Sequence, residues 1–364
     1  MSAAPLTRAM LVEAPDDLDE LIEFFHARRW SDGLPIVPPT RERVERMLSC
    51  TTRKPDEVVA NVAPGFGAAT VERIAINAVM AGCRADYLPV LIAATEAMTA
   101  KEFNLQGIQA TTNPVAVWLV VNGPIAEQLG VNGGMNCLGQ GTVANATLGR
   151  ALRLILQNLG GAIPGEMDRA THGQPGKFSF CCAENEAQSP WEALHVERGF
   201  KRDQSTVTVI GAAGTHNMNT HAKDADDLIR VIADTMAFPT SNDYWIAGEP
   251  WIIVSPEHAE VLHAGGLSKA DVKRRLWEAS KMSAGRMAKI ELARTQTARS
   301  EELGPITTNT LLPVSRGPED VGILVAGGPG THSVYVASFG DARAVTREIV
   351  CGCSRSERAA VPTI

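Results

Sequence analysis

Aromatic residues, long apolar runs and an excess of basic charge are all scarce in this sequence. Aromatic residues make up 5% of the chain, and apolar runs such as 114–121 are far shorter than the roughly 18 to 20 residues that cross a bilayer. Acidic residues outnumber basic ones by 41 to 34, which leaves a net charge of −7, whereas binding to a phosphate backbone needs clustered positive charge. We therefore expect neither a membrane nor a nucleic acid as partner.

Several common catalytic and cofactor motifs are also missing. The chain has no His-Glu-x-x-His, no Cys-x-x-Cys, no Walker lysine and no Gly-x-Gly-x-x-Gly. These absences exclude the common zinc peptidases, zinc ribbons and P-loop NTPases, and they leave no nucleotide cofactor motif. A divalent metal held by some of His172, His195, His216, His221 and the glutamates stays open, although their spacing matches no standard zinc motif.

The cysteines and the N-terminus predict where the protein works. Seven cysteines, an odd number scattered over a long chain, do not form a disulfide framework and are typical of reduced thiols. Residues 1–16 are mixed and acidic, whereas a signal peptide has a basic stretch followed by an apolar one. We expect a cytoplasmic protein.

The order of apolar patterns and turn residues predicts an α/β fold, with a mixed α+β arrangement as the alternative. We expect layered sheets with covering helices in two subdomains, 1–205 and 206–364, because 364 residues exceed the usual size of a single core. The expected helices are 16–28, 41–48, 69–81, 88–100, 142–159, 225–236, 256–263, 268–280 and the polar segment 282–302. The expected strands are 113–122, 177–182, 206–210, 244–246, 251–254, 321–326, 333–337 and 344–349.

The densest group of titratable residues lies in segment 171–198, which combines histidines, cysteines, glutamates, a lysine and an arginine. This is the inventory of general acid–base chemistry. If 177–182 is a strand, Glu184 and Glu186 project the same way beyond its end, and two nearby carboxyl groups drive their pKa values apart. The alternative is a loop with solvated charges. The candidate catalytic residues are His172, Glu184, Glu186, His195 and Glu197, with Lys177 and Arg198 orienting a substrate carboxylate or stabilising negative charge.

Loops rich in glycine and asparagine supply candidate residues for holding an anion. Segment 130–141 contains five glycines and leads into the longest expected helix, an arrangement that suits an anion site. The turn at 327–330 either forms a nest of backbone N–H groups or is a hairpin turn without chemical consequence. The loop 30–40 is either a rigid connector or a wall of the active site. The candidate binding residues are Asp32, Asn122, Asn132, His216, Asn217, Gly327, Gly328 and His332.

The cysteines give a second line of chemistry. Cys83 lies beside an arginine in a turn between two expected helices, where a helix end or a guanidinium lowers a thiol pKa, although a buried small residue explains it equally. Cys181 and Cys182 adjoin the polar segment, and Cys182 or Cys83 is a candidate nucleophile. Cys351 and Cys353 form a Cys-x-Cys pair that suits redox or metal chemistry, or are incidental thiols.

Four blocks of the chain together resemble a known family. They are 30–40 (WSDGLPIVPPT), 70–89 (TVERIAINAVMAGCRADYLP), 145–162 and 183–200 (AENEAQSPWEALHVERGF). The chain resembles, over most of residues 20–275, a widespread bacterial family associated with small thiol or selenol proteins named for a UGSC motif. Residues 351–354 read CGCS and are displaced by one residue from that motif. The resemblance implies a single enzyme-like unit and names no reaction.

These observations predict an enzyme that acts on a small polar or anionic metabolite or xenobiotic by proton transfer, of the lyase, hydratase or hydrolase type. The alternative is a thiol-redox or thiol-carrier protein working through its cysteines, and a third interpretation is a binding protein without catalysis. The alanine-rich segments 69–81 and 88–100 suit packing across a two-fold axis, so we expect a homo-oligomer.

Overall fold

The structure, a computed structural model, describes residues 10–351. The helices are α1 (Leu18–Ala27), α2 (Arg41–Leu48), α3 (Val71–Ala81), α4 (Leu88–Met98), α5 (Leu105–Ala110), α6 (Pro124–Leu129), α7 (Val143–Asn158), α8 (Leu194–Glu197), α9 (Ala225–Met236), α10 (Asn242–Ile246), α11 (Pro256–Ala264), α12 (Lys269–Ala279) and α13 (Lys289–Leu303). The strands are β1 (Val58–Val62), β2 (Gly67–Thr70), β3 (Ala116–Asn122), β4 (Cys181–Ala183), β5 (Thr206–Asn219), β6 (Trp251–Val254), β7 (Met282–Ser283), β8 (Leu311–Leu312), β9 (Gly322–Val325), β10 (His332–Ser338) and β11 (Val345–Glu348).

Local sequence explains where the main helices begin and end. α9 begins after Asp224, whose side chain accepts hydrogen bonds from the N–H groups of residues 226 and 227. Thr70 caps α3 in the same way, and Gly82 ends it in the left-handed conformation that glycine tolerates. Apart from segment 282–302, the expected helices are confirmed with small shifts at their ends.

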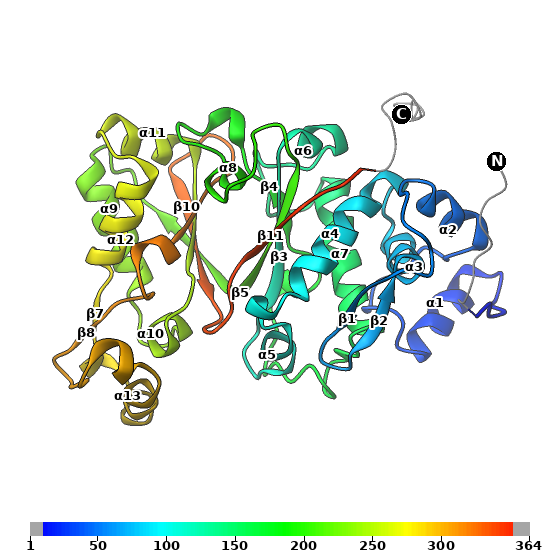
Figure 1. Cartoon of the computed structure of the whole chain (residues 1–364), viewed down its shortest axis with the longest axis horizontal. Helices are drawn as coiled ribbons and strands as arrows, with labels where there is room; N and C mark the ends of the chain where they lie inside the picture. Colours follow the sequence, from blue (N-terminus) through cyan, green and yellow to red (C-terminus); the bar gives the residue numbers. More distant parts are fainter. Residues whose placement is uncertain (1–9, 352–364) are drawn as a thin grey trace.

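Within residues 10–351 the main sheet has seven strands, in the order β4-β3-β5-β10-β6-β9 with β11 paired to β5 (Figure 1). The β3–β4 and β6–β9 pairs are parallel, whereas β5 runs antiparallel to β3, β10 and β11. β10 lies between β5 and β6. The sheet is therefore mixed, and the α/β class is confirmed.

The sheet curls around an interior core. The rings of Trp118 on β3 and Trp251 on β6 have centroids 6.1 Å apart, although two strands separate β3 from β6 in the sheet. Flat strands at about 4.8 Å spacing would hold those side chains more than twice as far apart. The edge strands also approach each other, since the N–H of Asn185, just after β4, donates to the carbonyl of Val325 at the end of β9.

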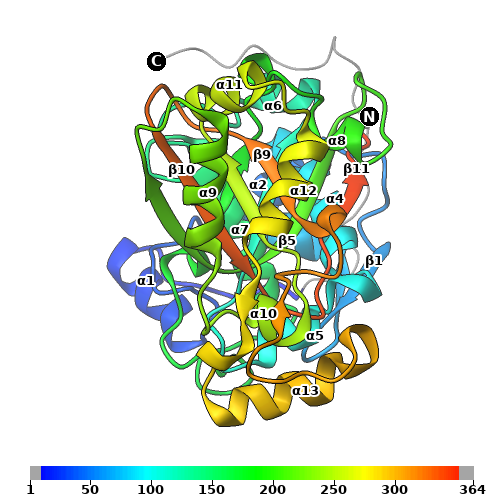
Figure 2. The ribbon, with the colours of Figure 1, turned by 90° about the vertical axis from the view of Figure 1, so that its left-hand side faces the viewer.

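Two helical layers cover the outer faces of this curled sheet. α3, α4 and α7 pack on the side drawn at the right of Figure 1, and α9, α11 and α12 on the opposite side. Figure 2 shows α9 and α12 in front of the strands, with α13 below them. The buried apolar residues accordingly form one cluster on each side and a third inside the curl.

Three strand predictions are wrong in extent or type. The expected strand 177–182 is reduced to β4, because Pro175–Lys177 form a 3₁₀ turn. Residues 244–246 belong to α10, since the Ser241 side chain caps a helix there. The expected strand 206–210 is too short, because β5 continues through Gly211 and Gly214 to Asn219. The expected helix 282–302 is also shorter, because residues 282–283 form β7 and α13 begins at Lys289.

The turn at 327–330 does not form a hairpin. β9 and β10 flank this turn in sequence, but β6 lies between them in the sheet. The main sheet also takes strands from both sides of the expected boundary at 205/206, because β5 pairs with β3 on one edge and β10 on the other. The division into two subdomains stays a prediction.

Candidate functional site

A cavity of about 850 Å³ lies between α8 and α12, next to the first residues of β6 and β9. The Trp251 indole lines it from the curled sheet, and the charged side chains of Glu197, Arg198, Glu249 and Lys269 line it from the surrounding elements. Two of these residues, Glu197 and Arg198, belong to the segment in which the sequence predicts acid–base chemistry. This cavity is the candidate active site.

Glu197 is an ionised carboxylate held by two lysines of α12. The Lys269 Nζ lies 2.9 Å from Glu197 Oε2, and Lys273 Nζ donates to Oε1. Burial favours the neutral acid, but the charges of Lys269 and Lys273 outweigh that effect and hold the pKa of Glu197 below its ordinary value. Lys269 also donates to the Glu192 carbonyl at 3.1 Å, which fixes its ammonium group in the cavity wall.

Glu249 is the opposite case in the same cavity. Its side chain accepts from Arg198 Nη2 at 3.0 Å and from the Ala344 N–H at 2.9 Å, and the residue is only 8% exposed. Burial raises the pKa of Glu249 above its ordinary value, although the Arg198 charge acts against this shift. Arg198 itself is fixed by the Ala344 carbonyl and lies over the Trp251 ring, 5.5 Å from its centroid.

Behind the cavity wall lies a buried polar group at the ends of β3 and β4. Glu184 Oε2 accepts from Asn122 Nδ2 at 2.6 Å and from the Leu194 N–H at 2.7 Å. Leu194 is the first residue of α8, whose N-cap Ala193 has no side-chain oxygen, so Glu184 caps this short helix from outside. Burial raises the pKa of Glu184, while Lys269 acts in the opposite direction.

Glu186 and His195 complete this buried group. Glu186 Oε1 accepts from the Gly123 N–H at 2.7 Å and from Asn122 Nδ2 at 3.1 Å. His195 is fully buried, and its Nδ1 lies 3.8 Å from Glu186 Oε1. The structure therefore brings Asn122, Glu184, Glu186 and His195 together in one cluster, and the two glutamates lie close to each other, as expected. The cluster lies behind the cavity wall, and the catalytic role of its residues stays a prediction.

His172 and Lys177 lie apart from this cluster. Lys177 lies beside Ala116 at the start of β3, whereas Glu184 contacts Asn122 at its end, and a seven-residue strand spans roughly 20 Å. Lys177 Nζ is 2.7 Å from both Asp168 carboxylate oxygens, and His172 is exposed. Lys177 is therefore held in an ion pair away from these glutamates, and its predicted role in orienting a substrate carboxylate stays a prediction.

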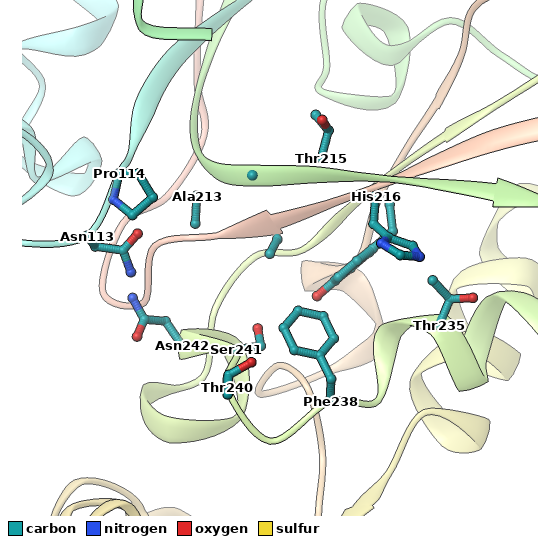
Figure 3. Close-up of a pocket in the computed structure, with 13 residues that line it drawn as sticks. Asn113, Pro114, Ala213, Thr215, His216, Thr235, Phe238, Thr240, Ser241 and Asn242 are labelled. Carbon is teal, nitrogen blue, oxygen red and sulfur yellow. The ribbon is translucent and has the colours of Figure 1, made fainter. Parts of the chain in front are cut away.

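His216 lines a second cavity, of about 570 Å³, which residues of β5, β10 and segment 235–242 enclose (Figure 3). His216 and Phe238 face its interior, and Asn113 and Asn242 point toward one another across it. Asn217, the next residue on β5, instead pairs through Nδ2 with His332 Nδ1 at 3.3 Å. The predicted binding residues His216 and Asn217 therefore do not share one site, because successive strand residues face opposite sides.

The remaining predicted binding residues serve local structure. The Asp32 carboxylate accepts two hydrogen bonds from Arg150, both 2.8 Å long, which fasten loop 30–40 to α7. Asn132 Oδ1 accepts from the Gly134 N–H inside the glycine loop. The Gly327 N–H donates to the Gly133 carbonyl at 2.9 Å, and Gly328 lies against Met135. The two glycine segments thus pack on each other, and the Gly327 N–H is engaged by the Gly133 carbonyl, so the predicted anion nest at 327–330 stays a prediction.

The cysteine predictions need two corrections. Burial raises the pKa of Cys83 to about 12, against the expected lowering, and the Cys83 thiol donates to the Thr147 carbonyl at 3.3 Å. Cys181 and Cys182 point to opposite faces of β4, one into the outer core and the other into the interior of the curl. They do not form a pair with each other. Cys351 is exposed, and Cys353 lies outside the described residues.

Sequence reasoning missed several residues of the cavity. Glu249, Trp251, Lys269 and Lys273 come from segments 50 or more residues away in the chain, and no motif connects them to Glu197. Cys137 appeared only as part of a glycine loop, although it lies in the same interior cluster as Cys182. The Ser268–Asp271 capping box, which begins α12, was the one local signal near these lysines.

Two observations concern partners and metals. Between residues 10 and 351, no helix combines the length and the apolar character needed to span a membrane. The same residues bring together no group of three or more His, Cys, Asp or Glu side chains in an arrangement that suits a metal ion. The expected homo-oligomer, small-molecule substrate and cytoplasmic location stay predictions.

Comparisons of the chain with protein-family models, with curated proteins and with solved structures found no match.

Proposed function

We propose that this protein is an acid–base enzyme acting on a small polar molecule in the cavity between α8 and α12. The supporting observation is that two carboxyl groups in one cavity have pKa values shifted in opposite directions, Glu197 downward and Glu249 upward. When two pKa values are separated in this way, one carboxyl group is protonated and the other is ionised at the same pH, so the two residues can take different roles in proton transfer.

Glu249 is the general acid of this proposal. Its raised pKa keeps it protonated at higher pH than an ordinary glutamate, so it has a proton to give to a leaving group or to an oxygen that becomes negative. Arg198, fixed between Glu249 and Trp251, stabilises the negative charge that the acid retains. Glu197 stays ionised and faces positive charge that develops on the substrate.

The lining of the cavity supports one class of substrate. Both cations and carboxylates line it, with Arg198, Lys269, Lys273 and Arg274 among acidic neighbours. A small molecule that carries both hydrogen-bond donors and a carboxylate or other acceptor matches this lining better than an apolar one. Elimination, hydration and hydrolysis are the reactions that a general acid with an ionised carboxylate supports.

The first test needs no substrate. The chain is labelled with ¹³C at the glutamate carboxyl carbons and titrated by NMR, with E249Q and E197Q used to assign the two resonances. We expect Glu249 to titrate above the ordinary value and Glu197 below it. A Glu249 pKa at or below that of an exposed glutamate would remove the basis of the proposal.

The second test addresses turnover. The whole protein is incubated with pooled small carboxylates, amides and hydroxy acids, and mass changes are followed by chromatography and mass spectrometry. We expect E249Q to lower the rate of any conversion by about 10²- to 10⁴-fold, the usual contribution of a general acid. E260Q, on an exposed side chain of α11 outside the cavity, serves as the control. Turnover by E249Q at the wild-type rate contradicts the assignment, and a ligand bound without conversion indicates a binding protein.

A further inference from the structure

The interior of the curled sheet contains two cysteines from different segments. Cys182 points inward from β4 and is fully buried, and Cys137 belongs to loop 130–141 and is 5% exposed. The two side chains are hydrogen-bonded to each other. A pair of thiols in contact, 45 positions apart in the chain, is independent of the α8–α12 cavity and of the function proposed for it.

The loop that carries Cys137 is exposed to solvent at the residues on either side of this cysteine. Met135, Asn136, Leu138 and Gly139 on either side of Cys137 are exposed. The loop is nevertheless held in place, because the Asn145 side chain donates to the Cys137 carbonyl at 3.0 Å and the Gly133 carbonyl accepts from Gly327. Cys137 is therefore the sulfur of the pair that lies nearer to the exposed part of the loop, whereas Cys182 is fully buried.

The environment distinguishes the two sulfur atoms. The hydrogen bond from the Cys182 thiol, together with backbone N–H groups that include those of Leu138 and Gly327, lowers the pKa of Cys137 against the effect of burial. Because Cys182 gives its proton to this interaction and is fully buried, its pKa is raised. Cys137 is accordingly the sulfur that attacks first, and Cys182 is the sulfur that attacks second.

We propose that Cys137 and Cys182 form a reversible redox pair that closes to a disulfide when a small peroxide is present. The Cys137 thiolate attacks the OH-bearing peroxide oxygen, the O–O bond breaks, and hydroxide (or alkoxide, from an alkyl peroxide) leaves with the electron pair and takes up a proton as water (or alcohol). The resulting Cys137 sulfenic acid is attacked by the Cys182 sulfur, the S–O bond breaks, and the oxygen leaves as water with the Cys182 proton. Two thiols are oxidised and one peroxide is reduced.

Closing this bond fastens loop 130–141 to β4, next to the Gly327 turn and the end of β9. The oxidised chain holds this corner of the curled sheet more tightly than the reduced chain does. A dithiol reductant reverses the step by exchange, and the two thiols return.

The test is a search for the cross-link in the native full-length protein. The protein is treated with hydrogen peroxide, its remaining thiols are alkylated, and it is digested with trypsin without reduction. We expect the tryptic peptide 102–150, whose cysteine is Cys137, joined to peptide 178–198 with two hydrogen atoms lost. We also expect the seven thiols per chain to fall to five and to return after treatment with dithiothreitol.

Variants assign the bond. C181S removes the second cysteine of peptide 178–198 and keeps the cross-link, whereas C137S and C182S abolish it. If a serine variant does not fold, fragmentation of the wild-type cross-linked peptide still distinguishes Cys181 from Cys182. Glutathione added to the same tube is the control for the oxidant. If this glutathione is fully oxidised while Cys137 and Cys182 are each still alkylated, the proposal is overturned. A bond between two chains, or over-oxidation of Cys137 without a cross-link, would do so as well.

Discussion

Replacing Asn145 with alanine measures how firmly α7 holds the glycine loop. The buried Asn145 side chain accepts from the Asn132 N–H at 2.8 Å and donates to the carbonyls of Asn132 at 2.9 Å and Cys137 at 3.0 Å. N145A removes all three hydrogen bonds. The Asn132 carbonyl keeps a bond from the Ala183 N–H, whereas the Asn132 N–H and the Cys137 carbonyl lose the partner that Asn145 provides.

The expected cost follows from these contacts. At a net contribution of about 1 kcal/mol for each hydrogen bond, N145A lowers the free energy of unfolding by about 3 kcal/mol. N145D keeps one acceptor but places a carboxylate against two carbonyls, so it is at least as destabilised as N145A at neutral pH. Those carbonyls raise the pKa of the new carboxyl group. Its stabilising contribution is therefore present below the unfolded value, about 3.9, and is lost as the pH rises through the folded value.

Urea unfolding, followed by tryptophan fluorescence, gives the free energies, and amide exchange of residues 131–138 shows whether the loss is local. T147A is the matched control on α7, because the Thr147 hydroxyl donates to the Val143 carbonyl of the same helix and makes no hydrogen bond to loop 130–141 in the described structure. We expect this control to stay within about 0.5 kcal/mol of wild type. If N145A also stays within that range, or if loop exchange is unchanged, Asn145 does not fix the loop and the reasoning fails.

Two further predictions concern buried carboxyl groups. D168N leaves the Lys177 ammonium buried beside an uncharged amide. We therefore expect a loss of about 3 kcal/mol in the free energy of unfolding measured in urea. A loss below about 1 kcal/mol would show that solvent compensates the lysine charge. Because burial raises the pKa of Glu184 in the folded protein, wild type loses stability as the pH rises from the unfolded value through the folded one. E184Q has no such loss, so its unfolding free energy relative to wild type should increase as the pH rises above the unfolded value of about 4.3, and parallel pH curves would contradict the assigned direction.

The sequence predicts elements well where a local cap and a periodic pattern agree. α9 is predicted at its observed bounds because Asp224 caps a regular amphipathic pattern. The full length of β5 escapes such reasoning, since Gly211 and Gly214 are typical of a strand end, whereas here Gly211 lies against Ile108 within the strand. Residues 244–246 have strand-forming side chains, but tertiary contacts and the Ser241 cap place them in a helix.

The candidate site was predictable only in the part that one segment supplies. Glu197 and Arg198 belong to the polar segment that composition singles out, and their neighbours Lys269 and Glu249 come from distant parts of the chain. Sequence distance also misled, because His172 and Glu184 are close along the chain but lie toward opposite ends of β3. The length of one buried strand separates them, and only the strand pairing reveals it.

The position of β10 in the sheet determines the order in which this chain can fold. β10 lies between β5 and β6, yet it is made after both of them during synthesis. Until Ser338 has left the ribosome, the outer half of β5 and one edge of β6 have no neighbour from β10 with which to pair, and unpaired edges invite association with other chains. The nascent protein therefore depends on late insertion of a central strand, so a chain truncated before residue 332 should aggregate and should not fold as a shortened domain.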